Sequence, residues 1–131
     1  MEEGRSSPMG RYPSTMSQVR HLLEHVCVDD SVLDACGTRG DAVSRVLQNH
    51  GLRATTNDLN GRLEADYHLD AGSDAFREVF TEEVVRPAWV VTSPPYRHAF
   101  LILVEALRVA RVGVAFKLRL SFLEPTKTRG E

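Results

Sequence analysis

The chain has 131 residues and a formal net charge of −2, with 42% apolar and 26% charged residues. This balance is ordinary for one globular domain that buries a core of its own. A nearly neutral chain lacks the strongly basic composition of many compact nucleic-acid binders. The two cysteines, Cys27 and Cys36, are too few for a disulfide framework or an all-cysteine zinc site. We therefore expect reduced thiols in an intracellular protein.

The N-terminal residues predict a loose segment followed by a helix. Residues 1–13 are rich in Gly, Ser, Pro and Arg, so we expect them to be disordered. They hold no apolar run, and no secretory signal is expected. A helix is expected from Ser14 or Thr15 to about His25, because apolar residues recur there at helical spacing.

The next segments alternate between strand and helix patterns. A short buried strand is expected over residues 31–36, a turn over 37–40 and a helix over 41–50 that Gly51 ends. A second strand follows over residues 54–58. This order predicts an α/β fold with a mostly parallel sheet.

The second half continues in the same way. It is expected to hold a loop over 60–73 with at most a short strand near Tyr67, a helix from Ala75 to about Val84, a strand over 89–92, a helix over 98–110 and a strand over 112–118. The most apolar stretch, residues 99–116, is interrupted by Glu105, Arg108 and Arg111. Charges near the centre of a span are costly in lipid, so we expect a buried helix and strand and no membrane segment.

The first group of chemically interesting residues surrounds a glycine turn. Asp34 ends the first strand, and Cys36, Gly37 and Gly40 follow before the next helix. Ligands of doubly wound folds bind beyond the carboxyl ends of the strands, where glycines let the backbone approach them. The alternative is a plain strand–helix connection that requires small residues.

The second group is Asn57-Asp58, at the end of the next strand. An acid about 20 residues after a glycine loop is placed to accept hydrogen bonds from ribose hydroxyls. The glycine loop after the first strand lacks the Gly-x-Gly-x-x-Gly pattern of NAD sites. This difference favours a nucleoside cofactor without a pyrophosphate. The alternative is an acid that shapes a turn.

The third group, Ser93-Pro94-Pro95-Tyr96, follows the buried strand over 89–92. Two prolines make a stiff loop with few N–H groups, so its polar groups are mainly acceptors. Acceptors beside an aromatic ring suit a planar group that bears an NH2. The alternative is a structural turn.

Together these residues resemble the class I S-adenosylmethionine-dependent amino-methyltransferases, which include DNA adenine-N6 and cytosine-N4 enzymes. Their signature is Asp/Asn/Ser-Pro-Pro-Tyr/Phe, and the likeness is to phage-like enzymes and their protist relatives. It covers about residues 12–120. It implies a Rossmann-like three-layer αβα sandwich that is incomplete at the C-terminus, with a partial domain over residues 14–123 and a polar tail over 124–131.

The resemblance also implies roles for particular residues. The cofactor S-adenosylmethionine would be bound by the loop after the first strand, by an acid at the ribose, by another at the adenine amino group and by a Pro-containing motif at its methionine end. Catalysis would belong to the Pro-Pro loop, and no metal is implied. The residues that the resemblance implies for the cofactor are Asp34, Cys36, Gly37, Gly40, Asp58, Asp70, Pro13 and Thr15, and those that it implies for catalysis are Ser93, Pro94, Pro95 and Tyr96.

The implied activity is methyl transfer to an exocyclic amino group of a nucleobase, with DNA a better candidate partner than RNA. Two alternatives stay open: methylation of RNA or of a protein glutamine, and an inactive truncated remnant. The remnant is favoured by the Gly37-Thr38-Arg39-Gly40 loop, which departs from the family's Gly-x-Gly, and by the short C-terminus.

Overall fold

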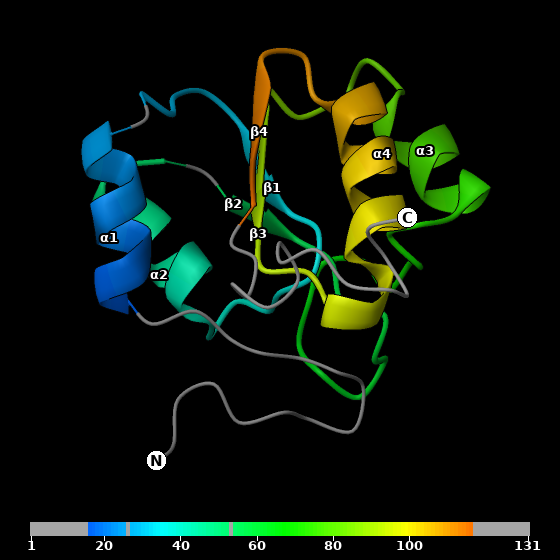
Figure 1. Cartoon of the computed structure of the whole chain (residues 1–131), viewed down its shortest axis with the longest axis horizontal. Helices are drawn as coiled ribbons and strands as arrows, with labels where there is room; N and C mark the ends of the chain where they lie inside the picture. The colour runs from blue at the N-terminus through cyan, green and yellow to red at the C-terminus, as the bar shows by residue number, and fades with distance from the viewer. Residues whose placement is uncertain (1–15, 26, 53, 117–131) are drawn as a thin grey trace, which may run out of the picture.

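A parallel four-stranded sheet lies between two pairs of helices in the computed structural model, which describes residues 16–25, 27–52 and 54–116. Figure 1 shows α1 and α2 on one side of the sheet, with α3 and α4 on the other. The α/β class and the parallel sheet are confirmed. The elements are α1 Met16–His25, β1 Val32–Asp34, α2 Ala42–Asn49, β2 Ala54–Thr56, α3 Asp74–Phe80, β3 Trp89–Thr92, the 3-10 turn η1 Tyr96–His98, α4 Ala99–Val109 and β4 Gly113–Phe116.

The strands lie in the order β2-β1-β3-β4, and every pair is parallel. From β1 the chain crosses to β2 on one side, whereas β3 and β4 lie on the other side. The strand order therefore reverses between β1 and β3. In open α/β sheets, ligands bind at this kind of switch point, beyond the carboxyl ends of the strands.

The core has two apolar clusters, one on each face of the sheet. Neighbouring residues of a strand point to opposite faces, so Leu33 and Val90 belong to the cluster with Phe76 of α3. Val32 and Val91 belong to the cluster with the α1 and α2 side chains. Both faces are thus covered, which explains why β1 and β3 read as nearly continuous apolar runs.

Helix ends follow from local hydrogen bonds. The predicted stop at Gly51 is confirmed, since this residue has a φ of 75°. The expectation that α3 reaches Val84 is wrong, because α3 ends at Phe80. There Thr81 Oγ1 donates to the carbonyl of Arg77 at 2.7 Å, and turns follow.

The expected strand near Tyr67 is reduced to a single bridge with Asn57.

The apolar stretch over residues 99–116 forms α4 and β4, as expected from its charges. Glu105 is buried within α4, where Arg77 Nη1 lies 2.9 Å from its Oε2 and links α3 to α4. Across the described ranges, no helix is both long and apolar enough to cross a bilayer.

Candidate functional site

Polar side chains join the carboxyl ends of β1 and β3. Thr92 Oγ1 donates to Asp34 Oδ1 at 2.6 Å, and it accepts from the backbone N–H of Cys36 at 2.9 Å. The same N–H lies 3.2 Å from Asp34 Oδ1. Asp34 and Thr92 are each only 2% exposed. The predicted cofactor acid is therefore turned inward, where it fixes the loop after β1 to the end of β3.

The two glycines of this loop have different surroundings. A Cβ at Gly37 would overlap the carboxylate of Asp34, whereas a Cβ at Gly40 would meet nothing within 4 Å. Gly37 is therefore required for the Asp34 carboxylate to keep its position. Gly40 is exposed, and no atom of the described chain demands a glycine there.

Asn57, which follows β2, ties three segments together. Its Nδ2 donates to the carbonyls of Ala35 at 2.8 Å and Leu69 at 3.0 Å, and its Oδ1 accepts from the Leu69 N–H at 2.9 Å. The residue is fully buried. Asn57 therefore holds the segments that lead into Asp58 and Asp70 against the end of β1.

The two predicted acids on these segments both shape turns. Asp58 Oδ1 accepts from the N–H of Asn60 at 3.0 Å, and Asp70 Oδ1 accepts from the N–H of Gly72 at 3.0 Å. Asp58 is 6% exposed, whereas Asp70 is exposed. A turn role and a ligand role are compatible, because a carboxylate offers about four acceptor positions.

Ser93, Pro94 and Pro95 form the link between β3 and η1, which begins at Tyr96. Pro94 is buried, and the carbonyl of Pro95 accepts from the N–H of His98 at 3.2 Å. A hollow of about 490 Å³ lies beside Ser93, between α1 and the ends of β3 and β4. It is lined by Ser17, Gln18, Val19, His21, Leu22, Val43, Val91, Thr92, Ser93, Ala115 and Phe116.

The structure thus places the predicted residues in two groups on either side of the Asp34–Thr92 hydrogen bond. Ser93 borders the hollow on the α1 side, and Asp58 and Asp70 follow the end of β2 without lining that hollow. Pro13 and Thr15 fall outside the described residues, and for Tyr96 only the backbone is described.

A second polar link supports the loop after β1. Arg39 Nη2 lies 2.5 Å from Asp66 Oδ1, and Asp66 Oδ2 accepts from the N–H and the hydroxyl of Thr56 at 2.9 and 3.1 Å. Partial burial acts to raise the pKa of Asp66, but the hydrogen bonds from Arg39 and Thr56 outweigh it and lower this pKa. The hydrogen bond to Asp66 raises the pKa of Arg39.

Sequence reasoning missed the roles of Thr92 and Asp66. Thr92 is the one polar residue of the β3 run Trp89–Thr92, and this break in an apolar pattern is a signal that points to it. Asp66 carries no local signal, because its partners Arg39 and Thr56 lie 27 and 10 residues away.

No family model, no curated protein and no solved structure matches this chain. The description of the site therefore rests on its geometry and on the sequence motifs.

Proposed function

We propose that the chain is a Rossmann-like methyltransferase domain that uses S-adenosylmethionine to methylate an exocyclic amino group of a nucleobase, with DNA as its partner. One observation carries the proposal. The Ser93-Pro94-Pro95 loop begins where Thr92 is hydrogen-bonded to Asp34, at the point where the strand order reverses. The family-like motif and the glycine loop thus share the edge of the sheet where ligands of such folds bind.

The cofactor site is assigned to the ends of β1 and β2. Gly37 keeps the loop backbone close to Asp34. Its N–H donates to the carbonyl of Asn57 at 2.9 Å, and this bond holds the start of the Asp58 turn against the same loop. Asp58 would accept hydrogen bonds from the ribose hydroxyls. These residues fit a nucleoside cofactor, which when bound supplies an electrophilic methyl group on its sulfonium sulfur.

The target amine is assigned to the hollow beside Ser93. Its volume of about 490 Å³ lies within the range of small-molecule sites, and a base flipped out of a duplex would enter it. The lone pair of an exocyclic amine is delocalised into the ring. The Ser93 side chain and the Pro94 carbonyl would accept its two hydrogens, favouring a pyramidal nitrogen, while Tyr96 would stack on the base.

Proline restricts the loop backbone, so its acceptors need little rearrangement when the substrate arrives. Ser93→Ala should therefore lower kcat for methyl transfer by about 100-fold, by analogy with the loss of one hydrogen-bonding group in other active sites. The affinity for S-adenosylhomocysteine should stay nearly unchanged. Labelled S-adenosylmethionine with DNA of mixed sequence, RNA and protein extract as acceptors measures this.

Ser44→Ala is the matched control, because Ser44 is a buried serine of α2 that does not line the hollow. Equal effects of the two serine variants would contradict the role of Ser93. Label in RNA or protein alone would change the substrate class. A folded chain that binds the cofactor product but labels no acceptor would support a non-catalytic domain.

A further inference from the structure

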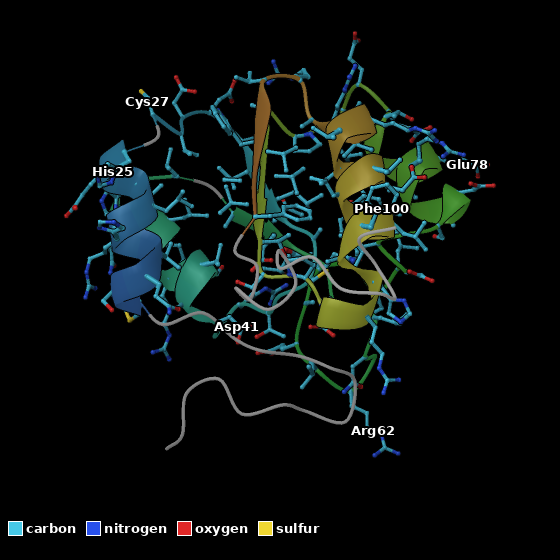
Figure 2. All side chains as sticks on the ribbon, in the orientation of Figure 1. His25, Cys27, Asp41, Arg62, Glu78 and Phe100 are labelled. Atoms are coloured by element: carbon cyan, nitrogen blue, oxygen red, sulfur yellow. The ribbon has the colours of Figure 1, made fainter. Side chains whose placement is uncertain are left out.

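One face of α1 carries three side chains with metal-ligand chemistry. His21, Glu24 and His25 each place one possible ligand atom within 4.8 Å of the others. His21 Nδ1 lies 3.7 Å from Glu24 Oε1, and the two imidazole centroids are 4.6 Å apart. All three residues are exposed. In Figure 2, His25 lies on the side of α1 that faces away from the sheet.

The hydrogen bond of His25 fixes which ring nitrogen is available. His25 Nδ1 lies 2.9 Å from the backbone carbonyl of His21. A carbonyl oxygen only accepts, so in the neutral ring Nδ1 carries the proton and Nε2 carries the lone pair. Imidazoles that bind metals commonly have this arrangement, in which a backbone carbonyl orients the ring from its other nitrogen.

The helix beneath these side chains is held in place by its other face. Val19 is 4% exposed and belongs to the apolar cluster of α2 and the sheet, and Leu22 packs against this cluster. Residues three and four apart lie on the same side of a helix. The two imidazoles and the carboxylate therefore project together from a helix that is anchored to the core.

We propose that His21, Glu24 and His25 bind one divalent transition-metal ion of the Zn²⁺, Ni²⁺ or Co²⁺ class, with water completing the coordination. Two imidazoles and one carboxylate suit these ions, whereas Mg²⁺ and Ca²⁺ prefer oxygen ligands. Three protein ligands and an open position are a familiar zinc arrangement. This site contains none of the residues that are given a role in methyl transfer, and it shares His21 with the lining of the hollow beside Ser93.

The test is titration of the untagged full chain with Zn²⁺ by calorimetry and with Co²⁺ by visible absorption. One ion should bind per chain, and His21→Ala and His25→Ala should each weaken Zn²⁺ binding by about tenfold or more. Lower pH should weaken it too, since protons compete for the imidazole nitrogens. A long-range nitrogen–proton NMR spectrum should show the His25 Nε2 signal shifting with Zn²⁺.

Two control variants separate this site from other ligands. His50 Nδ1 lies 2.9 Å from the carbonyl of Val46, the same type of bond that His25 makes with His21. Val46, however, has no side chain that can bind a metal ion. His50→Ala should therefore leave the affinity unchanged. Cys27 is an exposed thiol close in sequence to His25, and Cys27→Ser should also bind Zn²⁺ like the parent.

Three results of the Zn²⁺ titrations would overturn the proposal, and a fourth comes from competition with Mg²⁺. They are no saturable Zn²⁺ binding by the folded parent, binding unchanged in the double variant of His21 and His25, and binding that Cys27→Ser removes. Competition by Mg²⁺ at concentrations equal to Zn²⁺ would also contradict the assigned ligand chemistry.

Discussion

Gly37 and Gly40 lie in the same loop, yet only one of them has a steric reason to be glycine. An added Cβ at Gly37 would overlap the Asp34 carboxylate, so Gly37→Ala forces that carboxylate or the loop to move. We expect a loss of about 1–3 kcal/mol in the free energy of unfolding, as for other overpacked sites. Gly40→Ala should change it by less than about 0.5 kcal/mol, as at other open surface positions. Urea denaturation of both variants measures this, and equal losses would contradict the assigned role of Gly37.

The residue types at the site are readable from the sequence, but their partners are not. Asp34 is predictable as the acid that ends a strand before a glycine turn. Its bond to Thr92 joins residues 58 positions apart, and the bond from Asn57 to Ala35 spans 22 positions. Local patterns carry no information at these separations. The sequence therefore predicts acids facing a ligand, whereas the structure turns Asp34 inward.

At the level of elements, Asp66 connects the edge strand β2 to the loop after β1. Its carboxylate accepts from Thr56 and pairs with Arg39, and these bonds lower its pKa below the ordinary value of 3.8. A lowered pKa in the folded state means that the stabilisation is fully present above the unfolded pKa. It is lost as the pH falls through the lower, folded value.

Asp66→Asn should accordingly lower the free energy of unfolding by about 1 kcal/mol near neutral pH, the usual worth of such bonds at a partly exposed site. The difference from the parent should shrink as the pH falls below the ordinary aspartate pKa. Urea denaturation over a pH series measures it, with Glu83→Gln as a control at an exposed carboxylate. A difference that stays constant with pH would contradict the role of Asp66.

Element bounds were predictable where strong local signals agree. The strand over 89–92 is found with its predicted bounds, because a run of β-forming residues is followed at once by Ser93-Pro94-Pro95. The length of α3 was overestimated because Arg86-Pro87 is the more obvious break. At the earlier stop, both the N–H and the hydroxyl of Thr81 donate to the carbonyl of Arg77, and the residue pattern does not reveal this local arrangement.

For the molecule as a whole, the sequence predicts a parallel α/β sheet but not the order of its strands. The order β2-β1-β3-β4 places the glycine loop, which follows β1, between the ends of β2 and β3. On one side the end of β2 leads to Asp58, and on the other side the end of β3 leads to Ser93. A cofactor beyond the end of β2 and a target base beyond the end of β3 would lie on opposite sides of the Asp34–Thr92 hydrogen bond.

The most direct test of this arrangement is calorimetric titration of the folded full chain with S-adenosylhomocysteine, beside Asp58→Ala and Glu78→Ala. Glu78 lies on the outer side of α3, away from the strand ends (Figure 2). The parent and Glu78→Ala should bind alike, and Asp58→Ala should bind about tenfold more weakly or worse, as expected for loss of a charged hydrogen-bond acceptor. No binding by a folded parent, or equal binding by Asp58→Ala, would contradict a cofactor site at the ends of β1 and β2.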